Sequence, residues 1–227
     1  MGEQKSILII GASRGLGLGL AQRFSEAGWH VTATVRDPAS PGALQAVPGV
    51  AIEALEMRDV ATIDALAQRL QGQVFDVLFI NAGIMGPTGD TDGASEAAIG
   101  ELFTINAVAP IRVARRLLPL VRERNGVLAF MSSVLGSVTM PEGLDLALYK
   151  ASKAALNSTT STFVSGLGDT SLTVLSMHPG WVKTDMGGEG ASIDVLTSTT
   201  GLFEQLQAQA GRGGHRFIDY QGNSIDW

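Results

Sequence analysis

The sequence predicts a single α/β domain, over residues 1–227, in which helices cover both faces of a parallel sheet. Short runs of aliphatic residues alternate along the chain with amphipathic stretches of helical length. The runs are apolar at nearly every position, which is typical of strands buried on both faces. Parallel strands need a crossover between them, and a right-handed helical crossover is the usual one. The predicted fold class is therefore doubly wound.

Seven apolar runs are expected to form the strands of the sheet, and five amphipathic stretches the helices. The runs are SILII (6–10), HVTATV (30–35), VAIEAL (50–55), VFDVLFI (74–80), GVLAFMS (126–132), LTVLSM (172–177) and HRFIDY (215–220). The helices are expected near 15–27, 60–71, 95–121, 146–168 and 192–210. The loop GGEGA (187–191) favours neither element and belongs to a small predicted substrate lid around 185–212.

The composition argues against several classes of function. Charged residues make up 17% of the chain and its net charge is −6, so that no basic surface for DNA or RNA is expected. A metal site is not expected either, because the chain has no cysteine and its three histidines, His30, His178 and His215, are far apart in sequence. No apolar run approaches the roughly 20 residues that span a bilayer. We therefore expect a cytoplasmic protein that binds neither nucleic acid nor membrane.

A glycine-rich stretch, GASRGLGLGL at 11–20, lies between the first predicted strand and the first predicted helix. Gly11, Gly15 and Gly17 would let a ligand approach the backbone closely. The free N–H groups and the positive dipole of the helix N-terminus would suit a pyrophosphate. The Gly-Lys-Ser/Thr of a Walker loop is missing, which favours a dinucleotide, with an ordinary tight turn as the alternative.

Tyr149 and Lys153, in YKASK, are four residues apart at the start of a predicted helix, so that both side chains lie on one face. A tyrosine with a pKa near 10 is a poor acid–base catalyst at neutral pH, but a neighbouring ammonium group would stabilise its phenolate and lower that pKa. The pair therefore indicates acid–base chemistry. An exposed tyrosine beside a solvated lysine is the alternative.

Other polar residues stand where apolar ones are expected. Ser132 and Ser133 end the fifth predicted strand, at the carboxyl edge where doubly wound sheets bind ligands, and one hydroxyl there could polarise a substrate carbonyl. Asn106, in TINAVAP, lies inside the long predicted helix, where asparagine has a poor propensity. Asn106 is therefore either functional or part of a buried kink.

These motifs together resemble the short-chain dehydrogenase/reductase family, whose glycine motif is T-G-x-x-x-G-x-G. Ile10 here replaces the threonine that helps tie the family's glycine loop to a neighbouring loop. YKASK resembles the family's Y-x-x-x-K motif, and MSSVLG (131–136) resembles its S-S-x-x-G segment. HPGWVKTDM (178–186) and FIDYQGNSIDW (217–227) are similar to the C-factor-like carbonyl reductase branch. The resemblance covers nearly the entire chain.

The resemblance implies a Rossmann-type sheet with the strand order 3-2-1-4-5-6-7 and four catalytic side chains. Tyr149 would protonate the carbonyl oxygen and Ser133 would orient it. Lys153 would lower the pKa of Tyr149 and hold the nicotinamide ribose of the cofactor. Asn106 would anchor a water molecule of the proton relay.

Ser133 is assigned to this set by its place in the family segment, whereas Ser132 would cap or fill the turn. The separation between Ser133 and Tyr149 is three residues longer than is usual in the family. The substrate loop around 140–145 is therefore expected to bulge.

The resemblance also implies a set of cofactor contacts. It comprises Gly11, Ser13, Arg14, Gly15, Leu16, Gly17, Arg36, Asp59, Asn81, Ala82, Gly83, Tyr149, Lys153, Pro179, Gly180, Val182 and Thr184. Asp59 would bind the adenine, although a helix N-cap explains it equally well. His178 is expected to be structural.

The cofactor is expected to be NADP(H). In NAD-dependent sites an acidic residue ends the second strand and binds the ribose, but Val35 stands at that position and Arg36 follows it. Arg36 and Arg14 could both bind a 2′-phosphate through charge-assisted hydrogen bonds. Asp37 is the competing reading as an NAD-type acid, but its place before Pro38 also suits a turn.

The expected function is NADPH-dependent reduction of an aldehyde or ketone to an alcohol. The alternative is a cofactor-binding signalling or regulatory protein of the C-factor type, in which turnover is incidental. The substrate is expected to be a small carbonyl compound, bound in an apolar pocket formed by Leu135, Met140, Trp181 and Met186. A homodimer is expected through the helices near 95–121 and 146–168, because the first of them is apolar on more than one face.

Overall fold

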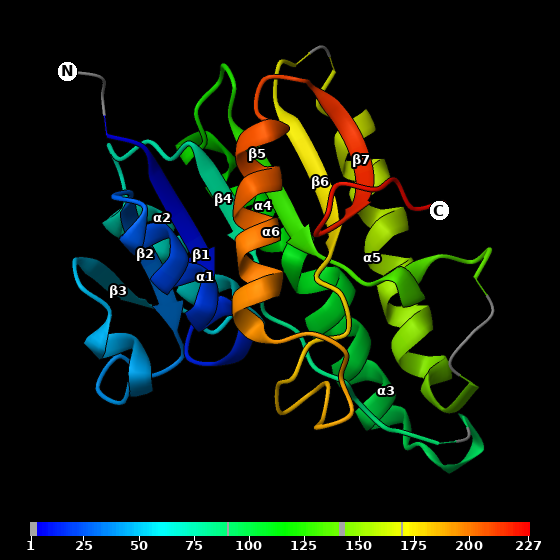
Figure 1. The fold of residues 1–227 in the computed structure, drawn as a ribbon. Coiled ribbons are helices and arrows are strands. Elements are labelled where there is room, and N and C mark those ends of the chain that lie inside the picture. Colours follow the sequence, from blue (N-terminus) through cyan, green and yellow to red (C-terminus); the bar gives the residue numbers. More distant parts are fainter. Residues whose placement is uncertain (1–3, 90, 141–143, 169) are drawn as a thin grey trace.

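The computed structural model describes residues 4–89, 91–140, 144–168 and 170–227. Its seven strands form one parallel sheet in the order β3-β2-β1-β4-β5-β6-β7, which confirms the predicted fold class (Figure 1). The strands are β1 (Ser6–Ile10), β2 (His30–Val35), β3 (Val50–Ala54), β4 (Val77–Ile80), β5 (Val127–Met131), β6 (Thr173–His178) and β7 (Gly214–Asp219).

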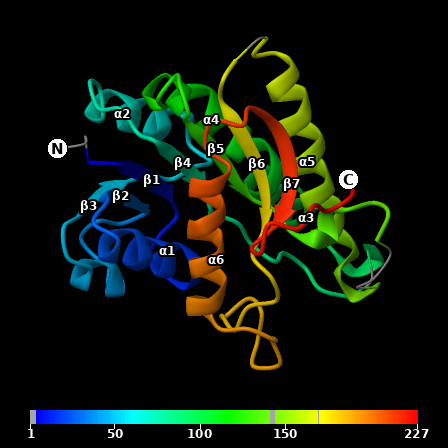
Figure 2. The same cartoon turned by 45° about the horizontal axis from the view of Figure 1, so that its top comes forward.

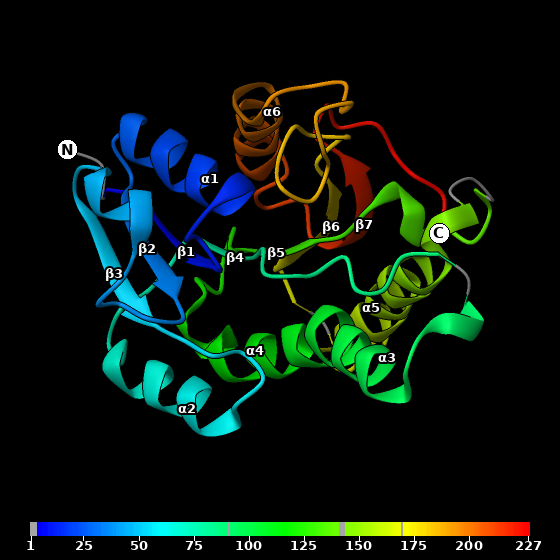
Figure 3. The same ribbon diagram turned by 90° about the horizontal axis from the view of Figure 1, so that it is seen from below.

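Helices cover both faces of the sheet. They are α1 (Gly15–Glu26), α2 (Val60–Arg69), α3 (Glu96–Phe103), α4 (Ala109–Leu117), α5 (Ala147–Ser165) and α6 (Val195–Ala208). Figure 3 shows α1 and α6 on one face, and α2, α4 and α5 on the other. The crossovers of a parallel sheet place its helices in this way.

Strand β1 shows why the predicted strands are apolar at every position. All five of its residues are buried. Ile7 and Ile9 belong to the core beneath α1 and α6, whereas Leu8 and Ile10 belong to the core on the other face. Because alternate side chains of a strand point to opposite faces, a strand between two helix layers must be apolar throughout.

The helix predicted near 95–121 is continuous but irregular. A π-helical turn, Thr104–Val108 (η3), separates α3 from α4, and a short 3₁₀ turn, Leu118–Leu120 (η4), ends it. π-turns inside α-helices occur frequently at functional sites. Asn106 lies in this turn and is buried, so that an asparagine with poor helix propensity coincides with the irregularity.

By length and composition alone, the stretch Glu96–Leu120 could also cross a membrane, with a mean hydropathy of 1.3. The packing of the helix provides another reason for its apolar composition. Leu102, Val113 and Leu117 are fully buried, and α4 contacts both β4 and α5. Core helices of α/β domains pass the same test of length and hydropathy.

The packing also bears on the predicted dimer, which needs a second apolar stripe on these helices. Among the described residues of α3, η3, α4 and α5, Val108 is the one large hydrophobic side chain that is exposed, at 41%. On the outer side of α5, Ser158, Thr159 and Thr162 are exposed. The apolar residues expected at a dimer interface are instead used in the core, and the dimer stays a prediction.

The segment expected as a lid, around 185–212, divides into two parts. Residues 195–208 form α6, in which Leu202 and Leu206 are fully buried and pack in the same core as α1. This half therefore belongs to the helix layer. Only the loop that precedes α6 is left to act as a lid.

The last residues of the chain cover the free edge of the sheet at β7, opposite the edge formed by β3 (Figure 2). Two backbone hydrogen bonds of 2.9 Å join β7 to residues 223–225. The ring of Trp227 packs on those of His215 and Phe217, with centroid distances of 4.6 and 5.4 Å. Uncovered edge strands offer unpaired N–H and C=O groups to other chains, and the C-terminal segment protects β7 from such pairing.

Candidate active site

The predicted site residues come together at one edge of the sheet. Gly11 follows β1, Asn81 follows β4, Ser132 follows β5 and Pro179 lies just after β6. Since these strands are parallel, their carboxyl ends lie at the same edge, which is where doubly wound sheets bind ligands.

The glycines of the 11–20 stretch are required by close packing within the loop. Gly11 has a φ of +84°, and a Cβ on it would lie 2.7 Å from the Cβ of Ala82. A Cβ on Gly17 would overlap the carbonyl oxygen of Gly11. That oxygen accepts a hydrogen bond of 2.6 Å from Nδ2 of Asn81. The glycine loop and the loop after β4 are thus packed closely together, and Asn81 joins them through this hydrogen bond.

The N-terminus of α1 fits the pyrophosphate of a dinucleotide. Its N-cap residue, Arg14, is extended and makes no capping side-chain hydrogen bond within the described chain, whereas Asp59 caps α2 and Asp194 caps α6. The first N–H groups of a helix need partners from outside the helix. A phosphate group would supply them, and the helix dipole favours its charge.

Thr34 also holds the glycine loop, which lacks the family's threonine at position 10. The N–H of Gly11 donates to Oγ1 of Thr34 at 3.0 Å, and the N–H of Ala12 donates to its carbonyl oxygen at 2.9 Å. Thr34 was not among the predicted residues. Its signal in the sequence is a polar side chain inside a strand, HVTATV, that is otherwise expected to be buried.

Tyr149 and Ser133 meet as predicted. Tyr149 lies in the first turn of α5, Ser133 lies after β5, and both side chains are buried. Burial raises the pKa of Tyr149 to about 12, and a hydrogen bond with Ser133 opposes this rise. The predicted lowering of this pKa is therefore wrong for the structure, because loss of hydration outweighs the hydrogen bond with Ser133.

Lys153 lies one turn further along α5 and is also buried. Its Nζ donates to the carbonyl oxygen of Met131 at 2.9 Å and lies 5.7 Å from the ring centroid of Tyr149. Burial lowers the pKa of Lys153 to about 8. The alternative of a solvated lysine is thereby wrong.

We expect Lys153→Met to raise the thermal stability at pH 7. A lysine pKa lowered from 10.5 to about 8 corresponds to a destabilisation of roughly 3 kcal/mol while the group is charged. Methionine removes the charge at similar length, and the lost hydrogen bond to Met131 offsets about 1 kcal/mol of the gain. The midpoint of thermal unfolding, measured by calorimetry, should rise by roughly 4 to 8 °C.

This gain should shrink as the pH rises from 8 to 10.5. In that range the unfolded chain binds more protons at Lys153 than the folded chain does, so that the wild type gains stability with pH. A lower midpoint for the variant at pH 7, or a gain independent of pH, would contradict the cost assigned to the buried charge.

Asn106 holds three segments together. Its Oδ1 accepts from the N–H of Ile84 at 2.9 Å, and its Nδ2 donates to the carbonyl oxygen of Ile84 at 2.8 Å and to Oγ of Ser152 at 3.0 Å. A Cβ on Gly83 would lie 3.2 Å from Oδ1 of Asn106 and 3.4 Å from Nζ of Lys153. Both amide hydrogens of Asn106 are used, so that a relay water could bind only its remaining oxygen lone pair or its backbone.

Ser152 is a site residue that the sequence reading missed. It is fully buried, accepts the hydrogen bond from Asn106 and donates one of 2.7 Å to the carbonyl oxygen of Tyr149. The hydroxyl thus joins the π-turn to the first turn of α5. The signal is its place in YKASK, three residues after Tyr149 and on the same helical face.

Ser132 has a structural role, but it does not cap the turn as expected, since Oγ of Ser133 accepts the capping hydrogen bond from the N–H of Leu135 at 3.2 Å. Oγ of Ser132 donates to Oδ1 of Asn157 in α5 at 2.7 Å, and both residues are buried. Of the two serines, Ser133 is therefore the one that reaches Tyr149.

Asp59 caps α2, which is the structural explanation considered for it. Its Oδ1 accepts from the N–H of Ala61 at 2.9 Å. The first carboxylate beyond the end of β3 is that of Glu56, two residues after the strand. Glu56 directly follows the predicted strand 50–55, and this position is the signal in the sequence that could have found it.

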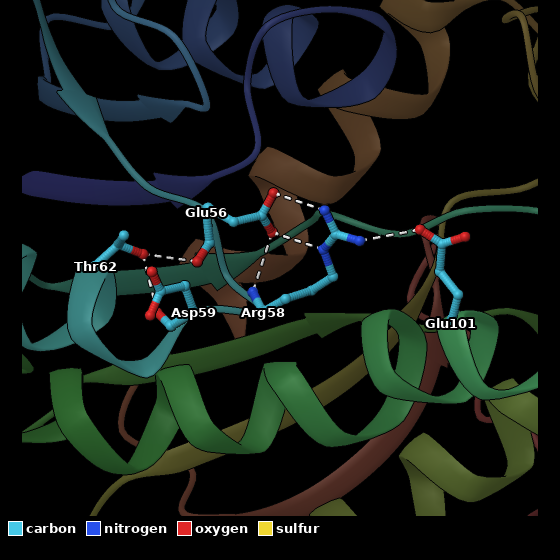
Figure 4. Close-up of polar contacts among 5 residues, drawn as sticks. All are labelled: Glu56, Arg58, Asp59, Thr62 and Glu101. Atoms are coloured by element: carbon cyan, nitrogen blue, oxygen red, sulfur yellow. Dashed lines mark hydrogen bonds and ion pairs between the residues drawn. The ribbon is translucent and has the colours of Figure 1, made fainter. Parts of the chain in front are cut away.

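The carboxylate of Glu56 is held in place by Arg58. Nε and Nη2 of Arg58 donate to its two oxygens at 3.1 and 3.2 Å, and Nη1 donates to Glu101 of α3 at 3.0 Å (Figure 4). The hydrogen bond with Arg58 holds the pKa of Glu56 below its ordinary value. The charge of Arg36 contributes to this lowering, which places the end of β2 beside the end of β3.

The two predicted phosphate-binding arginines have different surroundings in this structure. Arg36 is exposed just after β2, whereas Nη1 of Arg14 lies 3.0 Å from Oδ2 of Asp185. Asp37 accepts a hydrogen bond from the N–H of Ala39 at 2.9 Å and so stabilises the turn that follows β2. The geometry therefore supports the interpretation of Asp37 as a residue that stabilises a turn.

The segment after β6 carries the other predicted cofactor contacts. Gly180 has a φ of +84° and packs against the ring of Tyr220, and Val182 is buried. Oγ1 of Thr184 accepts from the N–H of Gly187 at 3.1 Å, which shapes a turn. A Cβ on Gly15 would lie 3.7 Å from Cγ2 of Thr184, so that this segment faces the glycine loop.

His178 has the structural character expected of it. Burial lowers its pKa to about 4, although the charge of Asp219 opposes this. Its Nδ1 is buried and has no hydrogen-bond partner in the described parts of the chain. An imidazole with so low a pKa is a weak base at neutral pH, which makes His178 a poor candidate for a general base.

The predicted substrate pocket is only partly assembled. Leu135 and Met140 line a hollow of about 230 Å³ with Ser137, Val138, Lys150, Ala151 and Ala154. Trp181 and Met186 lie outside this hollow and are 58% and 43% exposed. The bulge predicted around 140–145 falls partly on residues 141–143, which lie outside the described residues.

Comparisons with known proteins agree with this geometry. Residues 5–194 match the family model described as short chain dehydrogenase. The chain is 36% identical over 158 residues to C-signal of Myxococcus xanthus, covering 67% of this chain and 92% of that protein. A short-chain dehydrogenase/reductase from Burkholderia multivorans with bound NADP is 37% identical, with a TM-score of 0.95 over 99% of this chain and 100% of its own. A carbonyl reductase from Pseudomonas aeruginosa PAO1 in complex with NADP is 36% identical, with a TM-score of 0.92 and the same coverage.

Proposed function

Because this chain belongs to the short-chain dehydrogenase family and is an oxidoreductase of that family, we propose that it reduces the carbonyl group of an aldehyde or ketone with NADPH. The observation that carries the proposal is the buried pair of Ser133 and Tyr149, with Lys153 one turn further along α5. The pair lies at the same sheet edge as a glycine loop that fits a pyrophosphate.

NADPH, when bound, supplies the hydride that reduces the carbonyl carbon. The hydroxyl groups of Ser133 and Tyr149 both donate to the carbonyl oxygen and orient it. With a pKa of about 12, Tyr149 keeps its proton throughout the neutral range, so that it is ready to act as the acid. It transfers this proton to the oxygen as negative charge develops there.

Lys153 stabilises the negative charge that proton transfer leaves on Tyr149. With a pKa of about 8 it is mostly charged at pH 7, and burial strengthens its electrostatic effect. Asn106 and Ser152 position these groups by joining the backbone of Tyr149 to the loop that contains Gly83. The proton of Tyr149 is replaced through water held at the remaining acceptor positions of Asn106.

The cofactor is held by the loops after β1 and β2 at one side of the site and by the segment after β6 at the other. The N–H groups at the start of α1 bind the pyrophosphate, and Arg14 and Arg36 bind the 2′-phosphate. The segment Pro179–Thr184 faces the glycine loop and holds the nicotinamide end.

A screen of carbonyl compounds tests this function. The purified protein is incubated with NADPH and a panel of small apolar and aromatic aldehydes, ketones and quinones, with charged sugars as the comparison, and NADPH oxidation is followed by absorbance. Apolar compounds should be turned over fastest, because the residues proposed to form the substrate pocket, Leu135, Met140, Trp181 and Met186, are all apolar. Failure of the protein to bind NADPH in a calorimetric titration would overturn the proposal.

A second candidate function is signalling, favoured by the 36% identity to C-signal. In this function the cofactor is bound and turnover is incidental. Tyr149→Phe separates the two, since the substitution removes the proton donor and leaves the glycine loop intact. A biological activity that persists in the variant without reductase turnover would favour signalling.

A further inference from the structure

The loop at 181–193, called here the post-β6 loop, is held in shape by hydrogen bonds between its own residues. Val182 and Ile193 pair at its neck, and the N–H of Lys183 donates to the carbonyl oxygen of Ile193 at 2.9 Å. Nε1 of Trp181 donates to the carbonyl oxygen of Gly187 at 2.8 Å across the loop. These bonds lie within the loop and fix its shape. They do not fix its position relative to the glycine loop, which depends on other contacts.

One ion pair ties the post-β6 loop to the glycine loop in the described chain, between Arg14 and Asp185 at 3.0 Å. The two residues are 171 positions apart in sequence. Their side chains are 78% and 80% exposed, so that water competes with the pair and each side chain is free to turn away.

Arg14 also has a second anion within its reach when the proposed cofactor is bound. It lies in the loop after β1, and the end of the neighbouring strand β2 presents the exposed Arg36. The segment after β2 approaches the glycine loop, since a Cβ on Gly42 would lie 3.6 Å from the carbonyl oxygen of Ser13. A 2′-phosphate at the end of β2 would therefore lie near the loop that carries Arg14, whose side chain is paired with Asp185 in this structure.

We propose that Asp185 tunes the preference of the site for 2′-phosphorylated cofactors by competing with the 2′-phosphate for Arg14. This inference rests on the proposed function. A phosphate dianion binds a guanidinium more strongly than one exposed carboxylate does, so that NADPH displaces Asp185. The fraction of molecules in which Arg14 is paired with Asp185 lowers the apparent affinity for NADPH, but not for NADH, which has no 2′-phosphate.

Displacement of Asp185 also has a consequence for the post-β6 loop. Once Arg14 turns to the phosphate, the ion pair between this loop and the glycine loop is lost. Asp185 is thus a specificity-determining residue whose partner changes when NADPH binds.

The test is the dissociation constant of NADPH and of NADH, measured by calorimetry without substrate. Asp185→Asn should bind NADPH about threefold more tightly than the wild type, with NADH unchanged, because a weak exposed pair is removed. Glu189→Gln is the matched control, since it removes the same charge from an exposed position of the same loop. The control should change the NADPH affinity much less. In an Arg14→Ala background, Asp185→Asn should have no effect.

Three outcomes would overturn the inference while leaving the proposed function intact. These are an unchanged NADPH affinity in Asp185→Asn, a weaker one, or an equal gain in Glu189→Gln and Asp185→Asn, which would be a general charge effect. A wild-type protein that binds neither dinucleotide would instead overturn the proposed function, and this inference with it.

Discussion

Replacing Tyr149 by phenylalanine should lower kcat for carbonyl reduction by roughly a thousandfold, the scale of general acid catalysis by a positioned side chain. The substitution removes one hydroxyl group, which holds the transferable proton beside Ser133, and leaves the aromatic ring in its buried position. The dissociation constant for NADPH should stay within about twofold, because the glycine loop and the segment after β6 are untouched. Steady-state kinetics and calorimetric titration of the same preparation measure both quantities.

The control is the same substitution at the other tyrosine of the chain, Tyr220. Its ring packs against Gly180 and Gly201 but lies outside the group of Ser133, Tyr149 and Lys153. Tyr220→Phe should retain kcat within about threefold, since a substitution outside the reacting groups removes no transition-state contact. A kcat for Tyr149→Phe within tenfold of the wild type would show that Tyr149 is not the proton donor.

The second large effect is expected on cofactor affinity. Replacing both Arg14 and Arg36 by alanine should raise the dissociation constant for NADPH by roughly a hundredfold or more, because each charge-assisted contact contributes about 1.5 to 3 kcal/mol. The dissociation constant for NADH should change by less than about threefold, since NADH lacks the 2′-phosphate that these contacts serve. Both constants are measured by fluorescence titration without substrate.

Arg212→Ala controls for the loss of positive charge. Arg212 is exposed between α6 and β7, at the edge of the sheet opposite the glycine loop. It should leave both affinities unchanged. Equal losses for NADPH and NADH in the double variant, or a wild type that prefers NADH, would contradict the assignment of the two arginines.

The sequence was sufficient for the features that depend on residues close together in the chain. The seven strands were predicted from apolar runs, because a strand such as β1 that is buried on both faces has few polar positions to obscure its pattern. The pair of Tyr149 and Lys153 followed from helical spacing in the same way. The order of the strands followed from the family resemblance. The family motifs located Ser133, and the structure brings it to Tyr149.

Contacts between charged groups from distant parts of the chain were not predicted. The pair of Arg14 and Asp185, 171 positions apart, is one example. For Asp59 the sequence left adenine binding and a helix cap open, and the structure shows the cap while Glu56 stands beyond the strand end. A carboxylate three residues further from the strand can satisfy a helix terminus, and no local pattern distinguishes the two roles.

The sequence by itself thus predicted the fold, the glycine loop and the pairing of Tyr149 with Lys153 on one helix face. Only the tertiary structure decided the ionisation of Tyr149, the engagement of both amide hydrogens of Asn106, and the partner of Arg14. Backbone periodicity and turn chemistry are local properties, which a linear pattern records directly. The pKa of Tyr149 is raised rather than lowered because burial by residues from several elements removes its hydration, and burial is a property of the packed chain.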